Sequence, residues 1–298
     1  MPNANSPIVN VVFGSDKGYI AHLAVALCSL FDNNPDLALN VYILNSDIDP
    51  PSWKKIQSIA DRYDQKLIDL KVSEKDLEGL VTTWHFTLAT YYRLFIPEKL
   101  SVDRVLYLDV DIVVNGSIRE LYRTDLGDSF LAAVREPDFD RHEQLEMSKQ
   151  ANYFNAGVMV INLDKWREER LKESVIAMVK RKPEAMVFSD QCGINSVVNG
   201  RWTEVDPKFN LVHFYAREDL SNFKGMFPDN VLDDARRHPV IIHFSGASKP
   251  WHFHRKHPFR HLYWKYRKKT PFTRYFSEDL TVPRITRWFL GKIGVIAK

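Results

Sequence analysis

The sequence predicts an α/β fold with a doubly wound sheet. In the N-terminal part, short apolar runs alternate with segments of helical periodicity, the pattern of strand–helix–strand units in a parallel sheet. The run Val105-Leu-Tyr-Leu108 is continuously apolar, as expected of a strand buried on both faces. It ends in Asp109-Val110-Asp111, and open α/β sheets bind ligands at the carboxyl ends of their strands. The 298 residues are 45% hydrophobic and 27% charged, an ordinary composition for a soluble globular protein.

The expected elements follow from hydrophobic periodicity. Strands are expected at residues 8–13, 39–44, 66–70, 104–108, 129–134, 157–161 and 239–244. Helices are expected at residues 19–31, 50–63, 88–95, 164–181 and 190–198. Pro50 and Pro51 suit the first turn of their helix, and Asp164 is expected to cap a long amphipathic one.

Asp-x-Asp occurs three times, and context separates the three copies. Asp47–Asp49 lies beside two prolines and is interpreted as a turn entering a helix. Asp138–Asp140 lies in a polar stretch, so we expect a loop. Only Asp109 and Asp111 end an apolar strand. Two oxygen ligands at this spacing suit Mg²⁺ or Mn²⁺, ions that usually accompany a phosphate-bearing substrate. A structural turn is the alternative.

Asp16 lies in the loop after the first expected strand, between Gly14 and Gly18. Glycines there let the backbone approach a flat ligand closely, although an ordinary turn would have the same sequence. The loop lacks the Gly-x-Gly-x-x-Gly pattern, which disfavours a dinucleotide-binding fold.

His243 ends the last expected strand and is followed by Gly246 and Lys249. Its imidazole could be a hydrogen-bonded core group, or it could complete the shell of Mn²⁺, which accepts mixed nitrogen and oxygen ligands. In the second case Lys249 would meet a phosphate as a point charge. Two further residues are also open: Asp190 alone is an N-cap candidate, and Arg93 would be a surface arginine unless its helix borders a diphosphate.

Taken in order, these residues resemble glycosyltransferase family 8. The matching segments are Phe13-Gly-Ser-Asp16-x-x-Tyr19, Thr90-Tyr-Tyr-Arg93-Leu, Val105-Leu-Tyr-Leu-Asp-Val-Asp111, Phe154-Asn-Ala-Gly157, Asp190-Gln191 and His243-Phe-x-Gly246-x-x-Lys249-Pro-Trp251. The resemblance implies a retaining enzyme with a GT-A fold. Such a fold has a Rossmann-like mixed sheet flanked by helices, here with a basic helical C-terminal extension.

The resemblance also implies a role for each residue. Asp109, Asp111 and His243 would hold Mn²⁺, with Mg²⁺ as the alternative. The donor, UDP-galactose or UDP-glucose, would contact the two aspartates and Gly14, Asp16, Tyr19, Arg93, Val110, Asn155, Gly246 and Lys249. Asp190 and Gln191 would be the catalytic residues. Because an amide is a poor nucleophile, we expect same-face attack rather than a covalent intermediate on either of them.

The sequence thus predicts a hexosyltransferase that moves galactose or glucose to a glycan or a lipid-linked saccharide such as lipopolysaccharide. Glu136 and the loop 137–153 depart from the family pattern and leave the acceptor open. The alternatives are a glycogenin-like self-glucosylating protein and a catalytically silent nucleotide-sugar or membrane-binding module. A nucleotidyltransferase is disfavoured because the first loop has Lys17 and no arginine.

The C-terminal part differs in composition from the rest. Residues 250–298 contain 12 Lys and Arg against two Asp and Glu, together with eleven aromatic residues. Apolar and basic residues recur at helical spacing at Ile285, Trp288, Phe289, Lys292 and Ile296. A cationic, aromatic helix suits the interface of an anionic membrane, whereas nothing indicates nucleic-acid binding. A basic helix packed on the domain is the alternative.

We therefore predict a catalytic domain at 1–258 and a membrane-associating extension at 259–298. The N-terminal Met1-Pro-Asn-Ala-Asn-Ser-Pro7 has no apolar signal segment, and Cys28 and Cys192 do not make a disulfide framework. The expected location is the cytoplasm, peripheral on the inner face of the cytoplasmic membrane.

Overall fold

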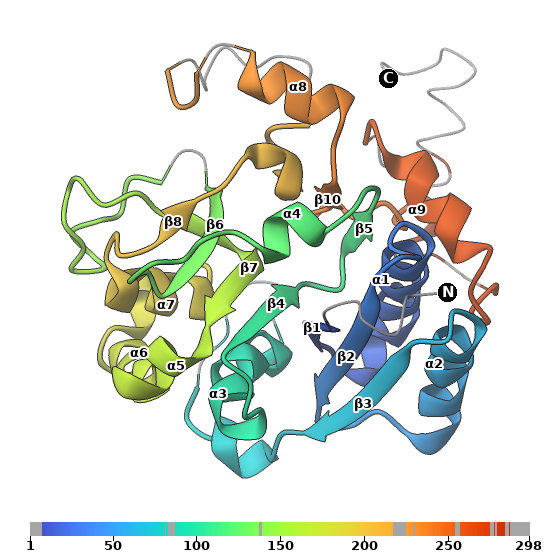
Figure 1. The fold of residues 1–298 in the computed structure, drawn as a ribbon, viewed down its shortest axis with the longest axis horizontal. Coiled ribbons are helices and arrows are strands. Elements are labelled where there is room, and N and C mark those ends of the chain that lie inside the picture. Colours follow the sequence, from blue (N-terminus) through green and yellow to red (C-terminus); the bar gives the residue numbers. More distant parts are fainter. Residues whose placement is uncertain are drawn as a thin grey trace.

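The computed structural model describes residues 8–80, 82, 87–136, 139–216, 225–228, 230–253, 257–274, 277, 279–283 and 286. Within them, a main sheet has the strand order β3-β2-β1-β4-β7-β6-β8 (Figure 1). Its strands are β1 Ile8–Gly14, β2 Ala38–Asn45, β3 Lys66–Lys71, β4 Arg104–Leu108, β6 Leu131–Arg135, β7 Phe154–Asn162 and β8 Thr203–Glu204.

The direction of the strands changes in the middle of the sheet. Strands β3, β2, β1 and β4 are mutually parallel, whereas β7 runs antiparallel to both β4 and β6. The sheet is therefore mixed. Because β7 is reversed, its first residues lie beside the last residues of β4, with Val158 opposite Leu108.

A small second sheet brings a distant segment to the same edge. It consists of β5 Ile112–Val114, β9 Leu211–Val212 and β10 Ile241–His243, in the order β5-β10-β9. Strand β10 is antiparallel to β5 and pairs His243 with Ile112. This pairing sets His243 next to the Asp109-Val110-Asp111 turn that joins β4 to β5.

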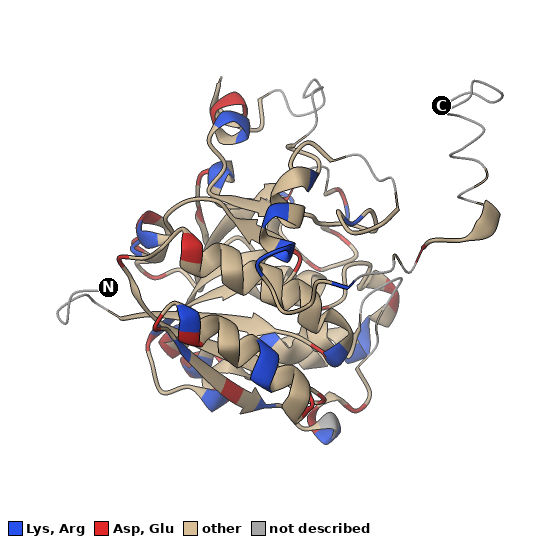
Figure 2. Ribbon diagram, turned by 90° about the vertical axis from the view of Figure 1, so that its right-hand side faces the viewer, with Lys and Arg blue, Asp and Glu red and all other residues tan. Residues whose placement is uncertain are grey.

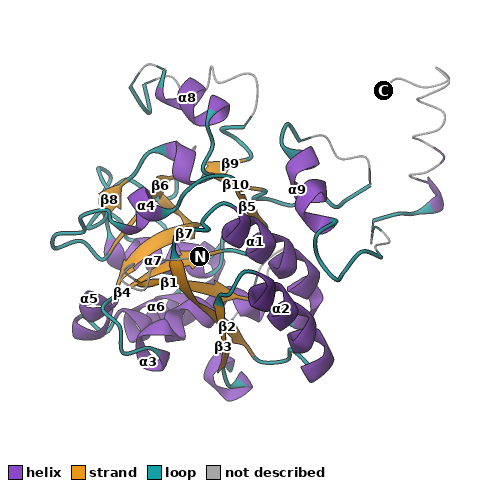
Figure 3. Cartoon of the chain, turned by 45° about the vertical axis from the view of Figure 1, so that its right-hand side comes forward, coloured by secondary structure: helices purple, strands orange, loops and turns teal. Residues whose placement is uncertain are grey.

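Helices cover both faces of the main sheet (Figures 1 and 3). Helices α1 Ile20–Asp32, α2 Pro50–Arg62 and α9 Arg260–Arg267 lie on one side, and α3 Ile96–Lys99, α5 Leu163–Glu168, α6 Leu171–Arg181 and α7 Asp190–Val198 on the other. The remaining helices are α4 Arg119–Tyr122 and α8 Val231–Arg237, with 3₁₀ segments η1 Lys17–Tyr19, η2 Glu74–Leu77, η3 Leu88–Phe95, η4 Pro183–Ala185 and η5 Pro207–Phe209.

Alternation along the strands divides the core into two clusters. Val11 and Phe13 pack on the side of α1 and α2, whereas Val12 packs on the side of α5, α6 and α7. Leu108 and Tyr107 of β4 divide in the same way. Successive strand side chains point to opposite faces, and a strand covered on both faces must be apolar throughout, as β1 and β4 are.

The predicted strands are confirmed, with shifted ends, but two of the predicted helices differ from the structure. The helix expected at 164–181 is two helices, because Arg170 adopts φ 49° between α5 and α6. The cap of α5 is Asn162, whose side chain accepts from the Lys165 amide, so Asp164 lies inside the first turn. The turn expected at Asp47–Asp49 does enter a helix, and Asp49 caps α2 by accepting from the Ser52 amide. The helix expected at 88–95 is a 3₁₀ segment.

The described part of the C-terminal extension packs on the sheet domain. Helix α9 lies against α1, and its Tyr263 and Tyr266 are buried in the same core cluster as β1. Figure 2 shows that Lys and Arg and Asp and Glu are both spread over the helices and loops of the described chain. Lys269 forms an ion pair of 2.5 Å with Asp32 of α1. The division at residue 258 stays a prediction, and the helix predicted around Trp288 lies outside the described residues. Among the helices that are described, none combines the length and the hydropathy needed to cross a bilayer.

Candidate functional site

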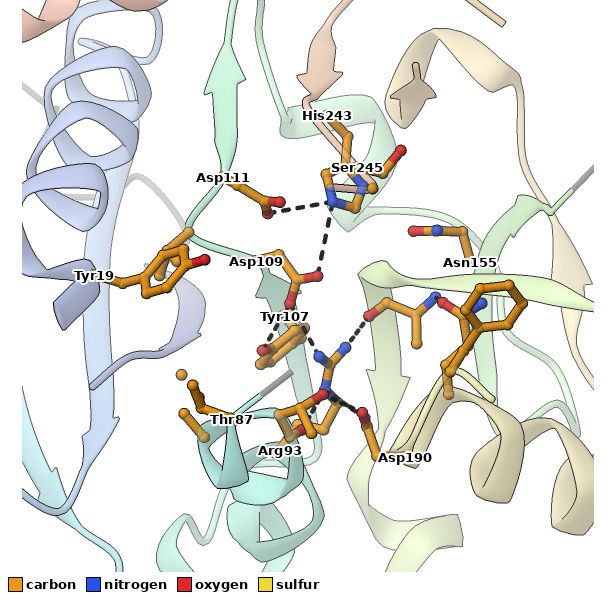
Figure 4. Close-up of a pocket in the computed structure, with 18 of the residues that line it drawn as sticks. Tyr19, Thr87, Arg93, Tyr107, Asp109, Asp111, Asn155, Asp190, His243 and Ser245 are labelled. Atoms are coloured by element: carbon orange, nitrogen blue, oxygen red, sulfur yellow. Dashed lines mark hydrogen bonds and ion pairs between the residues drawn. The ribbon is translucent and has the colours of Figure 1, made fainter. Parts of the chain in front are cut away.

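A cavity of about 480 Å³ opens where β1 and β4 end and β7 begins (Figure 4). This volume lies in the usual range for small-molecule sites. All of the residues that the sequence singled out for binding or catalysis line it: Gly14, Asp16, Tyr19, Arg93, Asp109, Val110, Asp111, Asn155, Asp190, Gln191, His243, Gly246 and Lys249. The structure thus brings together residues from both ends of the sequence, and their roles stay predictions.

Asp109, Asp111 and His243 form a cluster with the chemistry of a metal site. One ligand atom from each lies within 4.8 Å of the others. The His243 Nε2 is 3.3 Å from an Asp111 oxygen and 3.8 Å from an Asp109 oxygen. Two carboxylates and one imidazole suit a borderline divalent cation such as Mn²⁺.

Asn210 orients the histidine of this cluster. Its side-chain oxygen lies 2.9 Å from His243 Nδ1 and can only accept, so Nδ1 carries the proton. The Nε2 lone pair then faces the two carboxylates, the arrangement in which a second hydrogen bond fixes a metal-binding histidine. The two interpretations of His243 are therefore compatible, because one nitrogen is hydrogen-bonded in the core and the other faces the cluster.

Gly157 of β7 lies directly beneath the cluster. A Cβ at this position would come within 2.3 Å of His243 Cε1 and 2.7 Å of an Asp109 carboxylate oxygen. The Gly157 carbonyl also accepts from the Asp109 amide at 2.8 Å. Any side chain would therefore push the two cluster residues away, which explains a glycine inside an apolar strand.

Arg93 is buried, so its interpretation as a surface arginine is wrong. It is 4% exposed and pairs with Asp109 at 3.1 Å and with Asp190 at 2.9 Å (Figure 4). Its guanidinium also donates to the Ala156 carbonyl and lies over the Tyr107 ring, 4.3 Å from the centroid. Arg93 thereby connects the end of β4 to the start of α7.

Asp190 is not the N-cap of α7, because Ser189 occupies that position. The Asp190 carboxylate instead accepts from the Thr90 hydroxyl and pairs with Arg93. Burial raises the pKa of Asp190 to about 6, against the lowering effect of Arg93. Ser189 is buried with φ 49° and ψ −125°, a strained conformation for a residue with a side chain.

Gln191 and Asn155 belong to a hydrogen-bonded group where β7 begins, on the cavity wall. The Gln191 side-chain oxygen accepts from the Ala156 amide at 2.9 Å. Asn155 donates to Glu136 at 2.5 Å and accepts from Asn210 at 2.9 Å. Burial raises the pKa of Glu136. Hydrogen bonds to the backbone and to neighbouring side chains therefore fix the orientation of the Gln191 and Asn155 side-chain amides.

Lys249 and Gly246 come from the loop after β10. The Lys249 ammonium donates to Asp111 and, at 3.0 Å, to the Phe244 carbonyl, and the residue is 6% exposed. Burial would raise the pKa of Asp111, but Lys249 and His243 hold it well below its usual range. Gly246 has φ +80°, a conformation that favours glycine.

The opposite end of the cavity is formed by the loop after β1. Asp16 caps η1 by accepting from the Tyr19 amide at 3.0 Å, and its other oxygen accepts from Thr87 at 2.9 Å. The expected turn therefore exists, and its carboxylate also lines the cavity. At Gly14 a Cβ would lie 3.3 Å from the Tyr107 hydroxyl, so the backbone passes close to the floor of the site.

Sequence reasoning missed several residues of the cavity and of its support. Asn210 comes directly after the 3₁₀ segment η5, which ends at Phe209, and no sequence pattern identifies it as part of the site. Phe188, His213 and Phe214 also line the cavity, from segments without a motif. Gly157 could have been found, since a glycine in a buried strand indicates close approach of another group.

Comparison with known proteins gives a consistent result. The model of the family described as glycosyl transferase family 8 matches residues 10–255. General stress protein A of Bacillus subtilis is 28% identical over 270 residues, covering 88% of this chain and 94% of that protein. A lipopolysaccharide 1,3-galactosyltransferase of Salmonella typhimurium is 28% identical over 275 residues, covering 89% of this chain and 79% of that protein.

Among solved structures, the fold is similar to that of galactosyltransferase LgtC in complex with donor and acceptor sugar analogues. The TM-score is 0.79 at 25% identity, and the match covers 94% of this chain and 99% of that one.

Proposed function

Because the chain belongs to glycosyl transferase family 8 and has the GT-A fold, we propose that it transfers galactose or glucose from a UDP-sugar to a lipid-linked glycan of the lipopolysaccharide type, with retention. The observation that carries the proposal is the cluster of Asp109, Asp111 and His243, with Lys249 beside it, on the wall of a sugar-nucleotide-sized cavity. The galactosyltransferase similar to this chain supports galactose as the donor sugar.

The cluster residues fit a divalent cation, and Mn²⁺ suits their mixed nitrogen and oxygen ligands better than Mg²⁺. Such an ion supplies Lewis-acid stabilisation of a diphosphate leaving group. Lys249 places a second positive charge at the same point, so negative charge that develops on the leaving group is neutralised by two groups. The loop with Gly14, Asp16 and Tyr19 would hold the nucleoside.

Arg93, Asp190 and Gln191 would act on the donor sugar. Arg93, which also pairs with Asp109, fixes the Asp190 carboxylate by its second ion pair, and that carboxylate can accept from sugar hydroxyls. The bond from the Ala156 amide orients the Gln191 side chain, whose dipole would stabilise an oxocarbenium-like state. The acceptor hydroxyl would attack on the face that the diphosphate leaves, and its proton would pass to the leaving phosphate oxygen.

The alternatives need different observations. A self-glucosylating protein would gain mass in hexose steps when incubated with the UDP-sugar alone. A silent binding module would need no fixed catalytic carboxylate, and the burial of Asp190 against Arg93 at 2.9 Å disfavours it.

UDP release from a panel of UDP-sugars, with Mn²⁺ or with chelator, tests the proposal. We expect slow Mn²⁺-dependent release from one sugar, and a loss of about a thousandfold in Asp111→Ala. Asp128→Ala is the matched control, because Asp128 pairs with Lys165 at the surface. If no UDP-sugar in the panel releases UDP, and calorimetry also shows no Mn²⁺-dependent binding of UDP, the proposed metal and donor site is wrong.

We further propose that the extension 259–298 binds the protein to the inner face of an anionic membrane. Its excess of Lys and Arg and its aromatic residues support this partner. Removal of residues 280–298, which keeps Asp279, should leave activity on a soluble acceptor and lower the fraction bound to vesicles containing phosphatidylglycerol. Unchanged vesicle binding would contradict the membrane role.

A further inference from the structure

We propose that the C-terminal extension has a second task inside the enzyme: it positions the loop 244–253, which carries Gly246 and Lys249. The inference rests on the proposed function only in taking Lys249 as a phosphate contact. The residues involved lie behind the cavity and do not touch a substrate, so they are positioning residues.

Three hydrogen bonds tie the backbone of this loop to the extension. The Trp264 indole of α9 donates to the Pro250 carbonyl at 3.2 Å. The Ser277 hydroxyl donates to the Trp251 carbonyl at 3.2 Å, and the Phe253 amide donates to the Asp279 carboxylate at 2.8 Å. The backbone of Pro250, Trp251 and Phe253 is therefore hydrogen-bonded to side chains that follow the loop in the sequence.

An aromatic cluster holds the same loop from within. Trp251 is 3% exposed and stacks on His22 of α1, with ring centroids 3.6 Å apart and planes at 20°. The ring centroid of Tyr263, on α9, lies 5.3 Å from that of Trp251. The Tyr263 hydroxyl is hydrogen-bonded to His22 Nδ1 at 2.7 Å. Tyr19, on the cavity wall, packs against His22 edge to face, with ring centroids 5.4 Å apart. The cluster thus joins the loop after β1, which ends at Tyr19, to the loop 244–253 that carries Lys249.

Helix α9 has its own attachment to α1, so it can serve as a fixed support. The Tyr266 hydroxyl bonds to the Asn33 side chain at 2.7 Å, and the Arg267 guanidinium donates to the Ala21 carbonyl at 3.3 Å. Tyr266 and Arg267 are both buried. A side chain held by packing and by a second set of hydrogen bonds keeps the geometry that a reactive site needs.

The loop matters because of where Lys249 ends. Its ammonium reaches Asp111 across the site. Gly246, with φ +80°, allows the turn in the loop between β10 and Lys249. A displacement of the order of 1 Å at a charged contact can reduce a rate about a hundredfold. A support that does not contact the substrate can therefore affect how Lys249 meets the donor.

Trp264→Phe and Tyr263→Phe test the inference. The first removes the indole bond to the Pro250 carbonyl and leaves a smaller aromatic ring. The second removes the hydroxyl that bonds to His22 at 2.7 Å and accepts from Arg267 at 3.4 Å, and keeps the ring. Trp202→Phe is the matched control for the first variant, because the Trp202 indole likewise donates to a backbone carbonyl, that of Asn152 at 3.0 Å. Hydrogen exchange of the peptide that covers residues 244–253 is the first readout. Affinity for UDP with Mn²⁺ is the second.

We expect exchange of the loop to rise about fivefold in both α9 variants and to stay at the wild-type rate in Trp202→Phe, as the loss of a hydrogen bond of about 1 kcal/mol predicts. UDP affinity should fall by a similar factor. Unchanged exchange of the loop in both α9 variants would overturn the inference. If wild type binds no UDP, the proposed function fails, and the exchange of the loop still decides whether α9 positions it.

Discussion

Two walls at the cavity hold their shape by different forces. The ionic wall consists of Arg93, Asp109 and Asp190, at η3, the end of β4 and the start of α7, and is fixed by ion pairs of 3.1 and 2.9 Å. The aromatic wall consists of His22, Trp251 and Tyr263, which lie behind the lining residues Tyr19 and Lys249, and is fixed by stacking at 3.6 Å and the hydrogen bond between His22 and Tyr263. Arg93 and Asp190 are buried like the three aromatic residues, but only the first wall is charged.

The difference lies in how each wall responds to a single change. A buried charge that loses its partner keeps its desolvation penalty, so one substitution disrupts the whole ionic wall. An aromatic cluster loses contact area and at most one hydrogen bond, so its losses are graded. We expect function to depend on the first wall in an all-or-none way and on the second by degrees.

Arg93→Met should have the largest effect. It leaves Asp109 and the buried Asp190 without a cation, and we expect a loss of about 3–5 kcal/mol in the free energy of unfolding. The double variant with Asp190→Asn should recover part of this loss, because one uncompensated charge is removed. Urea unfolding at pH 7.5 measures both. A single variant within about 1 kcal/mol of wild type would show that this wall is not held by charge.

Gly157→Ala should weaken metal binding while the protein stays folded. Its Cβ would approach His243 and Asp109 to less than 3 Å, so we expect Mn²⁺ affinity to fall by roughly 10–100-fold. Gly116→Ala is the control, since its Cβ would meet Val240 at an ordinary 3.5 Å. Calorimetric titration with Mn²⁺ and UDP gives the answer, and wild-type affinity in Gly157→Ala would mean that the cluster can shift freely.

Asn210→Ala should have a smaller effect on the same cluster. The His243 tautomer loses its fixed partner, and we expect Mn²⁺ affinity to fall by about tenfold. Asn34→Ala is the comparison, because Asn34 is equally buried but bonds to the backbone far from the cavity. Equal Mn²⁺ affinity in the two variants would remove Asn210 from the account of the metal site.

His22 should contribute a pH dependence that is smallest at neutral pH. Burial lowers its pKa from 6.5 to about 3, and Arg267, Lys249 and His252 act in the same direction against Asp111. Below pH 6.5 the unfolded chain takes up a proton that the folded chain does not, so the free energy of unfolding falls as pH falls towards 3.

The slope from this one group is at most about 1.4 kcal/mol per pH unit. Urea unfolding of wild type and His22→Gln between pH 7 and 4 separates it from the carboxylates, which titrate in both proteins. The variant should show the shallower slope. Parallel curves would mean that His22 is protonated in the folded protein as well.

The ionic wall was easier to anticipate from sequence than the aromatic wall. Asp109 and Asp111 end an apolar strand, and Arg93 and Asp190 lie in segments with a family resemblance. Their meeting follows from the carboxyl ends of neighbouring strands sharing one edge. The pairing of Arg93 with Asp190, however, joins η3 to the start of α7 across about a hundred residues, which no local pattern reveals.

The supporting role of His22 could not be predicted from sequence, because His22 is one of several polar residues on an apolar helix. Its partner Tyr263 lies near the other end of the chain. The break at Arg170 was missed because hydrophobic periodicity continues across it, while the positive φ is set by tertiary packing. Sequence patterns identify what a residue can do in its own element, and the supporting contacts depend on how the elements meet.

The reversed strand β7 also has a consequence during synthesis. Strands β1 to β4 precede it in the chain, so on the ribosome β4 would have β1 on one side and an unpaired edge on the other until β7 emerges. An apolar strand with an open edge is a template for pairing with another chain. Nascent chains that stall before Asn162, and variants that weaken β7, are therefore expected to aggregate or recruit chaperones, even when every residue of the cavity is intact.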